Sequence, residues 1–480
     1  MCFLHPTKRV SVWLLLALTL SFAHCGSHSN TTEDPDPFLE QPVQFWVTSP
    51  DGGNLLYRRT LPFAAAKDDR FSTIEIDTAQ VFQSVEGFGY TLTGGSAYLI
   101  RRMNSNNRAA LLEELFGKTD KALGISYLRI SIGASDLDGE VFSYGDLPAG
   151  QTDVDLKRFS LSRDTMYLLP LLKEILRIRP ELKIMGTPWR APVWIKNNGS
   201  TKGGNLLPQY YEVYARYFVR YLQAMQQQGI RLDAITVQNE PQHGGNNPSM
   251  IMSAAEQTNF VKNYLGPALK AAGLTTQIII WDHNCDNPGF PLAVLSDPLA
   301  KSFIHGTAFH LYAGDIGALS TVHEAHPDRD VYFTEQWTGA NADFGGDLRW
   351  HIKNVIIGSM RNHSRTALEW NLASDPNYQP HTPGGCDQCK GALTIDGSSV
   401  KRNVSYYIIA HASRCVVPGS LRVESGQYTQ LPNVAFLRPD GKKVLIVLND
   451  SAQAQSFNIR AGNRWITTTV LAGNAATLMW

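Results

Sequence analysis

The sequence predicts an α/β fold: a parallel (β/α)8 TIM barrel with an all-β sandwich domain built from both chain termini. Within residues 83–415, eight short runs rich in β-branched and aromatic residues alternate with helical stretches, which is the pattern of consecutive βα units. Residues 41–82 and 416–480 instead alternate apolar and polar positions, as antiparallel strands do. Because these flanking strands need a partner face to bury their apolar side, we expect the two regions to pack together beside the barrel.

Residues 1–25 are predicted to be a signal peptide. Lys8 and Arg9 precede an apolar run, residues 10–23, that is shorter than the roughly 20 residues needed to span a bilayer. We therefore expect this segment to be cleaved and the mature protein to be exported.

Cys25 stands at the end of this segment and precedes a polar tether, residues 26–40. Its position is similar to that of the acylated cysteine of a bacterial lipoprotein, which would anchor the protein to a membrane. The preceding Phe22 and His24 are not the aliphatic and small residues usual before such a cysteine, so simple secretion stays open as the alternative. We expect a location in the bacterial cell envelope or outside the cell.

The composition excludes several classes of function. The 480 residues include 43 Lys and Arg and 43 Asp and Glu, so no net charge draws the chain to nucleic acid. The sequence contains no HExxH motif, no Walker loop and no GxGxxG motif followed by an acidic residue. We therefore expect a neutral substrate, no nucleic-acid partner, no metal and no organic cofactor.

Cys386 and Cys389 form a CxxC pair inside the string PGGCDQCKG. A second CxxC, which a zinc site of this kind would need, is absent from the sequence. In an exported chain the pair is expected to be either a local disulfide or two loop thiols. Cys285 and Cys415 are the other cysteines of the expected barrel.

The helical stretches carry start and stop signals. Ser253 and Glu256 fit a capping box, which satisfies two amide donors at the start of a helix. A last helix, over residues 405–415, is expected to close the barrel. In the C-terminal region, Asp440-Gly441 predicts a hairpin turn between two strands.

The eight expected barrel strands are VEGFGYT, YLRISIG, LKIMGT, DAITVQN, QIIIWD, GTAFHLY, VYFTEQ and TALEWN. The residues at their ends are Gly89, Tyr90, Asp136, Trp189, Asn239, Glu240, Trp281, Asp282, His310, Tyr312, Glu335, Glu369 and Trp370. In a barrel of this kind the carboxyl ends of all the strands meet at one mouth. Aromatic faces beside carboxylates and amides suit a sugar ring, which has apolar C–H faces and a rim of hydroxyls.

Glu240 and Glu335 are the candidate catalytic pair. They follow the fourth and seventh expected strands, nearly opposite each other at the barrel mouth. Hydrolysis of a glycoside needs one carboxyl that protonates the leaving oxygen and one carboxylate that attacks or stabilises the anomeric carbon. A separation of about 5–5.5 Å would give retention and about 6.5–9.5 Å inversion, and the sequence leaves both open.

Each of these residues also has a structural alternative. Glu240 precedes a proline and could begin a helix, where a carboxylate gains from the helix dipole. His310 could be a hydrogen-bonded core histidine, Asp136 could cap its loop, and the tryptophans could cover the core. The convergence of these residue types on one predicted face is what favours a glycosidase.

Six strings then identify a family: GFGYTLTGGSA, YLRISIGASD, KIMGTPWRAPVWIKNNG, TVQNEP, FTEQW and EWNL. In this order they resemble the motifs of glycoside hydrolase family 30, the glucosylceramidase family. The resemblance runs from about residue 85 to residue 480 and includes the flanking sandwich. It implies a retaining β-glycosidase, a glucosylceramidase-like β-glucosidase that works by double displacement through a covalent glycosyl-enzyme.

The resemblance also implies a role for each motif residue. Glu240 would be the general acid/base and Glu335 the nucleophile, with Asn239 at the 2-hydroxyl region of the sugar. The implied substrate-binding residues are Arg129, Asp136, Trp189, Asn239, His310, Tyr312 and Trp370. A positive charge at Arg129 would keep Glu335 ionised, whereas the pKa of Glu240 would have to be raised for it to serve as an acid.

Some positions depart from the lysosomal relatives. Leu311 replaces an aromatic residue, Gln336 replaces a small one, and the insert of residues 376–391 resembles bacterial and β-1,6-glucanase-like branches. The substrate is therefore expected to be a β-glucoside, a β-glucan or glucosylceramide. An endo-β-1,6-glucanase or β-xylosidase is the nearer alternative, and a non-catalytic sugar-binding surface lipoprotein is the alternative of another class.

Overall fold

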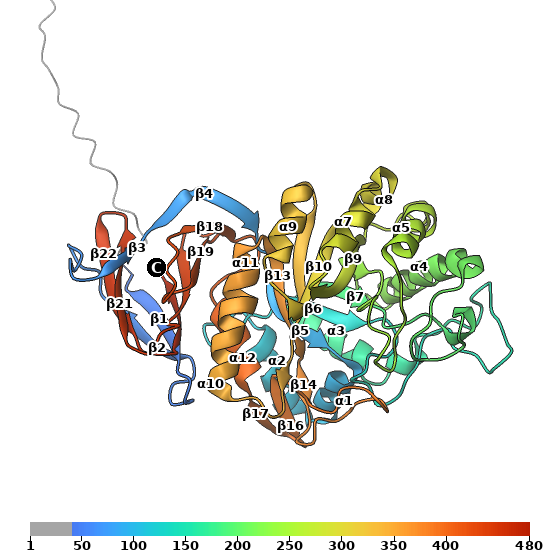
Figure 1. Ribbon diagram of the computed structural model, residues 1–480. Helices are drawn as coiled ribbons and strands as arrows, with labels where there is room; N and C mark the ends of the chain where they lie inside the picture. The colour runs from blue at the N-terminus through green and yellow to red at the C-terminus, as the bar shows by residue number, and fades with distance from the viewer. Residues whose placement is uncertain (1–40) are drawn as a thin grey trace, which may run out of the picture. The chain divides into compact units, whose positions relative to one another are not determined.

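The computed structural model describes residues 41–480, all of which belong to one compact unit (Figure 1). The predicted signal peptide, residues 1–25, and the polar tether, residues 26–40, lie outside the described residues. Among the described residues, no helix combines the length and the apolar character needed to cross a bilayer.

Eight parallel strands close into a barrel, in the order β10-β11-β13-β5-β6-β7-β8-β9. They are β5 (Gly87–Leu92), β6 (Tyr127–Ser131), β7 (Lys183–Thr187), β8 (Ala234–Thr236), β9 (Gln277–Cys285), β10 (Ile304–Gly314), β11 (Asp330–Glu335) and β13 (Ser364–Asn371). Each coincides with one of the eight expected runs, so the barrel prediction is confirmed. Its interior contains a buried cluster of apolar side chains, namely Tyr127, Met185, Ala234, Ile279, Ala308, Tyr332 and Leu368.

Helices connect the strands on the outside of the barrel. They are α1 (Gly94–Arg102), α2 (Ser105–Phe116), α3 (Leu168–Ile178), α4 (Tyr211–Gln227), α5 (Ala254–Phe260), α6 (Gly266–Ala271), α7 (Gly289–Leu295), α8 (Pro298–Phe303), α9 (Ala318–Ala325), α10 (Phe344–His351), α11 (Ser359–Arg361) and α12 (Val404–Ser413). The expected capping box of Ser253 and Glu256 is present at the start of α5. The expected closing helix is α12, which begins one residue earlier than predicted and ends two residues earlier.

The sandwich combines strands from both ends of the described chain. Its sheets have the orders β2-β1-β23-β20-β19-β18-β4 and β22-β21-β3. The strands are β1 (Val43–Thr48), β2 (Tyr57–Leu61), β3 (Ser72–Ile74), β4 (Ile76–Ser84), β18 (Leu421–Ser425), β19 (Asn433–Leu437), β20 (Lys443–Leu448), β21 (Gln455–Ala461), β22 (Arg464–Val470) and β23 (Ala475–Met479). In Figure 1 the blue N-terminal strands accordingly lie among the red C-terminal ones. This confirms the predicted sandwich of both termini.

A buried histidine joins the sandwich to the barrel. His411 lies in α12, and its two ring nitrogens are 2.9 Å from the hydroxyls of Thr477 and Thr48 in neighbouring strands β23 and β1. Burial lowers the pKa of His411 to about 3, so this histidine is neutral at physiological pH. At this point of the junction the hydrogen bonds are therefore neutral, whereas Arg349 and Lys353 form ion pairs with Asp450 of the sandwich elsewhere.

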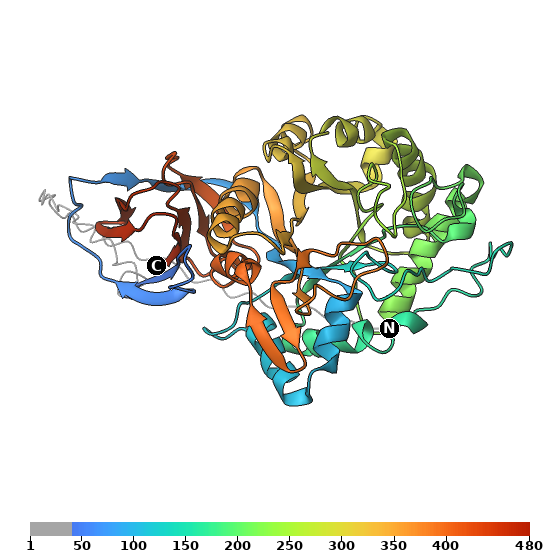
Figure 2. The same ribbon diagram turned by 60° about the horizontal axis from the view of Figure 1, so that its bottom comes forward.

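A second, smaller hairpin extends the barrel after β13. It consists of β16 (Leu393–Asp396) and β17 (Ser399–Arg402), which lie beside the blue helices α1 and α2 in Figure 2. The Asn104 side chain donates to the Ser398 hydroxyl at 2.9 Å, and Arg402 forms an ion pair with Glu114 of α2. These contacts fix the segment that leads out of the insert of residues 376–391.

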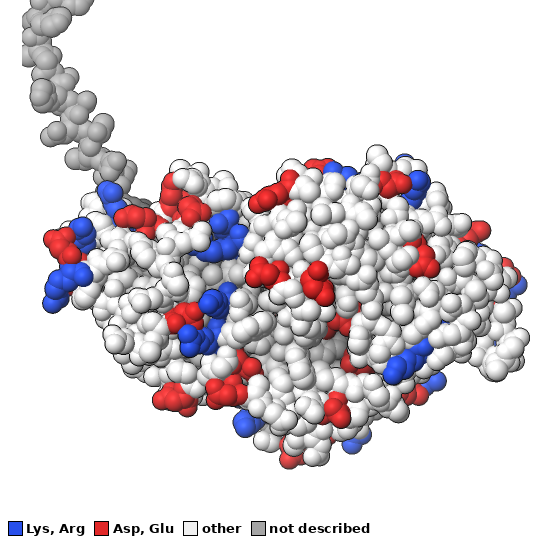
Figure 3. All heavy atoms as spheres, viewed as in Figure 1, with Lys and Arg blue, Asp and Glu red and all other residues white. Residues whose placement is uncertain are grey.

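The amino-terminal end of the barrel holds a closed cluster of charges. Arg365 contacts Glu86 at 3.2 Å and Asp330 at 2.9 Å. Lys183 contacts Glu86 at 3.0 Å, and His305 contacts Asp330 at 3.1 Å. Each carboxylate here therefore has a cationic partner. On the outer surface, in contrast, charges of both signs are scattered without a single-sign patch on the face in Figure 3.

Candidate active site

A cavity of about 420 Å³ opens at the carboxyl ends of the barrel strands. Seven of the nine predicted site residues line it, and they are Asp136, Trp189, Asn239, Glu240, Tyr312, Glu335 and Trp370. The other two, Arg129 and His310, are fully buried beneath it. The structure thus brings all nine together, because the strand ends that carry them meet at one mouth.

Glu335 is the last residue of β11, and two donors hold its carboxylate. Arg129 Nη1 donates to Glu335 Oε2 at 2.5 Å, and the Tyr312 hydroxyl donates to Oε1 at 3.0 Å. Both oxygens are thereby oriented, one by a charged donor and one by a neutral donor. The Glu335 side chain keeps a fixed position at the floor of the cavity.

Arg129 of β6 organises the floor of the site. Besides Glu335, its Nη2 donates to Asn239 Oδ1 at 2.6 Å and to Asp282 Oδ2 at 2.9 Å. Its guanidinium also lies 5.0 Å from the ring centre of Trp189 and 5.7 Å from that of Trp370. A planar group with several fixed donors can make all these contacts at once, which an ammonium group could not.

Glu240 lies in the loop after β8, and its backbone is strained. Its φ of +44° falls in the left-handed region that non-glycine residues rarely adopt. The Glu240 N–H donates to the backbone oxygen of Asp282 at 3.0 Å, which helps to hold this conformation. Strain of this kind is typical of sites where function fixes a side chain.

Two histidines border the Glu240 carboxyl. His310 Nδ1 lies 3.1 Å from Glu240 Oε1, and His283 Nδ1 lies 3.7 Å from the same oxygen. His310 Nε2 in turn lies 3.1 Å from Asp282 Oδ1, which orients the ring. His283 was not among the predicted site residues, although it follows Trp281 and Asp282 at the end of β9.

The histidines shift the protonation of the two glutamates. Burial raises the pKa of Glu240, but the neighbouring His283 and His310 outweigh this effect, so the net shift is downward. Burial raises the pKa of Glu335, and the opposing charges of His310 and Arg129 do not cancel this rise. Burial lowers the pKa of His310, yet the surrounding carboxylates raise it overall to about 9.

This order is the reverse of the one expected from the sequence, which placed a raised pKa at Glu240 and an ionised Glu335. The pKa of Glu335 rises because of its burial and the nearby charges of Glu240 and Asp282. The pKa of Glu240 falls because of the two histidines, which come from strands β9 and β10 and which the sequence could not place beside it. In the free site the proton shared by Glu240 and His310 therefore lies on the histidine.

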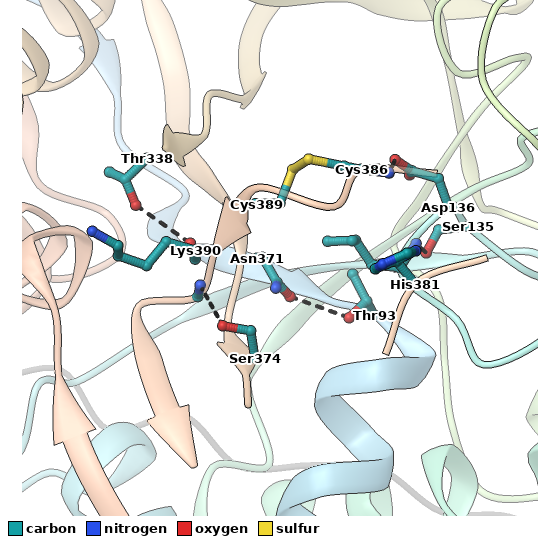
Figure 4. Close-up of a disulfide and its surroundings, with 12 residues drawn as sticks. Thr93, Ser135, Asp136, Thr338, Asn371, Ser374, His381, Cys386, Cys389 and Lys390 are labelled. Atoms are coloured by element: carbon teal, nitrogen blue, oxygen red, sulfur yellow. Dashed lines mark hydrogen bonds between the residues drawn. A yellow bond between two sulfur atoms is a disulfide. The ribbon is translucent and has the colours of Figure 1, made fainter. Parts of the chain in front are cut away.

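Asp136 lies on the loop after β6, against the insert of residues 376–391 (Figure 4). The Cys386 N–H donates to Asp136 Oδ2 at 3.3 Å, and the Thr382 N–H donates to the Asp136 backbone oxygen at 2.9 Å. Burial, together with the negative charge of Glu335, raises the pKa of Asp136 to about 7. Cys386 and Cys389 form a disulfide, which decides between the two expected states of this pair.

The aromatic side chains form one wall of the cavity. The rings of Trp189 and Trp370 stack with their centres 5.4 Å apart, and Leu137 and Cys389 pack against them. Trp337, which follows Glu335 by two residues, is only partly buried at the edge. Both rings of the stacked pair are almost fully buried but line the cavity, and such an aromatic wall is an apolar surface of the kind that sugar C–H faces contact.

The outer part of the cavity is polar. Gln242, His243, Asn246, and Asn284 line it on the side of Glu240. None of the four was predicted, because they lie on loops whose fold the strand pattern does not specify.

Within residues 41–480, two groups of three side chains bring possible metal-ligand atoms within 4.8 Å of one another. One group, at the cavity, is Glu240, His283 and His310. The other, at the opposite end of the barrel, is Glu86, His305 and Asp330. In both groups, contacts among the side chains themselves engage the carboxylates. Hydrogen bonds and ion pairs among these side chains thus account for their closeness. Catalysis without a metal stays a prediction.

The fold and this site together define a glycoside hydrolase. Two buried glutamates stand at the ends of the fourth and seventh barrel strands, and both carboxyls lie within 3.7 Å of the same nitrogen of His310. This proximity fits the shorter carboxyl separation of retaining enzymes, about 5–5.5 Å.

The chain belongs to glycosyl hydrolase family 30. Residues 85–416 match the family's TIM-barrel domain, and residues 419–478 match its beta sandwich domain. The resemblance noted in the sequence is thereby confirmed, and the protein is a retaining β-glycosidase. The alternative of a non-catalytic sugar-binding lipoprotein is not retained.

The names of similar proteins indicate two kinds of activity. The chain is 35% identical over 387 residues to an endo-1,6-beta-D-glucanase of Neurospora crassa, a match that covers 76% of this chain and 79% of the relative. It is 29% identical over 454 residues to the lysosomal acid glucosylceramidase of Mus musculus, covering 88% and 87%. Among solved structures, the endo-beta1,6-glucanase BT3312 superposes with a TM-score of 0.86 at 33% identity, covering 92% of this chain and 99% of that one.

Proposed function

We propose that the protein cleaves β-1,6-glucosidic bonds of a glucan with retention of configuration. The observation that carries this proposal is the polar outer lining of the cavity, formed by Gln242, His243, Asn246 and Asn284. Amide and imidazole groups can hydrogen bond to the hydroxyls of a second sugar, whereas the acyl chains of a ceramide could not use them. The similarity to endo-1,6-beta-glucanases supports the same substrate.

In the first step, Glu335 attacks the anomeric carbon while the bond to the leaving oxygen breaks. Arg129 and Tyr312 orient the attacking carboxylate through the two hydrogen bonds to its oxygens. The product is a glycosyl ester on Glu335, and the leaving oxygen takes a proton from Glu240. When Glu335 forms the ester it loses its negative charge, which reduces the electrostatic repulsion between the carboxylates around Arg129.

In the second step, water replaces the departed group and attacks the ester. Glu240 accepts a proton from this water, so the general acid of the first step acts as the base of the second. Two inversions at the same carbon give net retention. The free carboxylate of Glu335 then returns to its hydrogen bonds with Arg129 and Tyr312.

His310 supplies the proton that Glu240 must hold. Its Nδ1 lies 3.1 Å from Glu240 Oε1, close enough for direct proton transfer. A sugar that fills the cavity removes water from Glu240, and desolvation favours the neutral form of a carboxyl group. The proton then passes from His310 to Glu240, and onward to the leaving oxygen.

The sugar in front of Glu335 is held by groups of three kinds. Trp189 and Trp370 provide the apolar platform, and Asn239, fixed by Arg129, presents its amide to the hydroxyl next to the anomeric carbon. Asp136 accepts or donates a hydrogen bond on the far side of the ring. Together these contacts position the anomeric carbon over the Glu335 carboxylate.

A second candidate substrate is glucosylceramide, favoured by the similarity to the mouse lysosomal enzyme. Analysis of the products released from β-1,6-glucan, β-1,3-glucan, an aryl β-xyloside and glucosylceramide tests both. We expect the highest kcat/KM on β-1,6-glucan, with oligosaccharides among the early products. A higher kcat/KM on glucosylceramide would contradict the proposal.

Variants of the outer lining sharpen this test. His243→Ala with Asn246→Ala should raise KM for a β-1,6-linked oligosaccharide about 10-fold, because hydrogen bonds to the second sugar are lost. The same double variant should leave KM for an aryl β-glucoside nearly unchanged, since that substrate has only one sugar. Equal effects on both substrates would count against a glucan-binding role for this lining.

We also propose that the protein is exported and that Cys25 is acylated. The support is the sequence of residues 1–25 and the polar tether that follows. Metabolic labelling with radioactive palmitate should label the wild-type chain in a bacterial host, and Cys25→Ala should not be labelled. Secretion of an unlabelled wild-type chain would favour the alternative of simple secretion.

A further inference from the structure

The Cys386–Cys389 disulfide forms part of the wall of the active-site cavity. Both cysteines line the cavity, and Cys389 is buried against Trp189 and Trp370. Figure 4 shows the bridge spanning from the strand that carries Cys389 to the segment beside Asp136. A disulfide at this place can influence how the substrate is bound as well as how stable the loop is.

The Cys386 side of the bridge is attached to Asp136. The Cys386 N–H donates to Asp136 Oδ2 at 3.3 Å, and the Thr382 N–H donates to the Asp136 backbone oxygen at 2.9 Å. Gly385 lies so close that a Cβ there would stand 2.4 Å from that backbone oxygen. The insert therefore approaches Asp136 at a point where only glycine fits.

The Cys389 side is attached to the segment after Glu335. Cys389 and Lys390 form the short strand β15, which pairs with β12 (Thr338–Gly339). The Ala340 N–H also donates to the Gln388 backbone oxygen at 2.9 Å. Since β12 begins three residues after Glu335, this end of the bridge is joined to the strand that carries the nucleophile.

The insert consequently contacts two loops that are distant in the sequence, and the disulfide closes the short stretch of the insert between these two contacts. One carries Asp136 after β6, and the other carries Trp337 after β11. Between Cys386 and Cys389 only two residues intervene, so the covalent bond fixes the distance between the two attachments directly. Without it, the Asp136 side would depend on hydrogen bonds alone, made by Thr382, Cys386 and Asn247 at the edge of a cavity, where such bonds open more easily than packed ones.

We propose that the Cys386–Cys389 disulfide is a substrate-positioning element that holds Asp136 and the aromatic wall in their binding geometry. Reduction of the disulfide weakens binding of the sugar in front of Glu335 and leaves the chemical step nearly intact. This inference rests on the proposed function, because it assigns Asp136 to that sugar. The bridge acts through Asp136 and is not itself a catalytic group.

The expected effect falls on KM rather than kcat. Glu335 is held by Arg129 and Tyr312, and Glu240 is bordered by His283 and His310, none of which belongs to the insert. The catalytic carboxyls therefore keep their positions when the insert loosens. Loss of one oriented hydrogen bond to the sugar should raise KM about 3–10-fold.

The first measurement compares oxidised and reduced enzyme on an aryl β-glucoside. A water-soluble phosphine breaks the S–S bond: the phosphine gives two electrons and becomes its oxide, taking oxygen from water, and the two sulfurs leave as thiols. Within the described residues the remaining cysteines, Cys285 and Cys415, are already thiols, so this is the one bond the reagent cleaves there. We expect KM to rise about 3–10-fold, kcat to change less than about 2-fold, and reoxidation to restore KM.

The second measurement uses variants. Cys386→Ser with Cys389→Ser should reproduce the higher KM and should no longer respond to the phosphine, whereas the control Cys415→Ser should respond as the wild type does. In an Asp136→Asn background, removal of the disulfide should have little further effect, because the two changes act on the same contact. An additive effect in that background would overturn the inference, as would a KM unchanged by reduction.

A third measurement does not depend on catalysis. Amide hydrogen exchange of the reduced enzyme should increase in residues 376–391, including the Cys386 N–H, and stay unchanged in β9. If exchange rises as expected but no β-glucoside is turned over even by the oxidised enzyme, the proposed function has failed and the linkage between the loops stands. Unchanged exchange in the insert would overturn the linkage itself.

Discussion

The two ends of the barrel each hold an arginine that bridges two carboxylates, fully buried in the case of Arg129 and partly buried in the case of Arg365, yet the two clusters differ in how their charges are balanced. The bridges are Arg129 with Asp282 and Glu335 at the carboxyl end, and Arg365 with Glu86 and Asp330 at the amino end. At the amino end, Lys183 adds a second cation. The two carboxylates there are paired with two permanent cations, so the negative and positive charges of this cluster are balanced.

At the carboxyl end the carboxyl groups outnumber the permanent cations. Glu240 and Asp136 border the same cavity, and among the ion pairs of residues 41–480 neither is joined to an arginine or a lysine. These two carboxyl groups are stabilised without a permanent cation, because His310 lies within hydrogen-bond distance of Glu240 and the Cys386 N–H donates to Asp136. Buried carboxyls that lack a fixed cation are the ones whose protonation can change during a reaction, and this difference separates the catalytic end from the structural end.

The largest expected effect is the loss of the nucleophile. Glu335→Ala should reduce kcat on an aryl β-glucoside by at least about 10⁴-fold, because no other carboxylate can form the glycosyl ester. Azide, placed in the space left by the side chain, should restore turnover and give the glycosyl azide of inverted configuration. Near-normal turnover without azide would end the assignment of Glu335.

The second effect concerns Glu240 and depends on the leaving group. Glu240→Ala should slow a glycoside with a poor leaving group about 100-fold more than one with a good leaving group, which departs without a proton. Comparing kcat/KM for an alkyl and a dinitrophenyl β-glucoside gives this ratio. Equal losses on both would contradict an acid role.

The third effect belongs to the amino end of the barrel. Arg365→Ala should lower the free energy of unfolding by about 2–3 kcal/mol, because Glu86 and Asp330 lose their shared cation in a partly buried place. Denaturant unfolding measures this loss. KM and kcat of the folded fraction should match those of the wild type.

A change in KM for Arg365→Ala would contradict the assignment of a purely structural role to the amino end of the barrel. A matched variant at the carboxyl end, Arg129→Ala, should give the opposite pattern, with activity lost even where the protein remains folded. The pair thus tests whether similar bridges at two ends of one barrel serve different purposes.

The sequence predicted the barrel and the catalytic pair because both depend on strand ends. Runs of β-branched residues mark the strands, and the residue after each run must face the mouth, so Glu240 and Glu335 could be placed without coordinates. The reversed pKa order could not be predicted, since it depends on His283 and His310 meeting Glu240 in space. The contact of Cys386 with Asp136 was equally hidden, because it joins residues 250 positions apart through an irregular insert.

The smallest expected effect is a dependence of stability on pH. Asp138 and Asp164, near the same end of the barrel, also form no ion pair among residues 41–480, and burial raises the pKa of each to about 7. An unfolded chain releases these protons near pH 4. Between pH 4 and 7 the folded state therefore holds more protons, so the free energy of unfolding falls as pH rises through this window and levels above it.

Asp164→Asn isolates this contribution. The amide oxygen can still accept the hydrogen bond of the Tyr144 hydroxyl that Asp164 accepts now, while the titrating proton is removed. The slope of unfolding free energy against pH between 4 and 7 should flatten by up to about 1 kcal/mol per pH unit relative to the wild type. A slope equal to that of the wild type would mean that Asp164 is ionised in the folded protein, and that the surplus of carboxyls at this end is confined to the cavity.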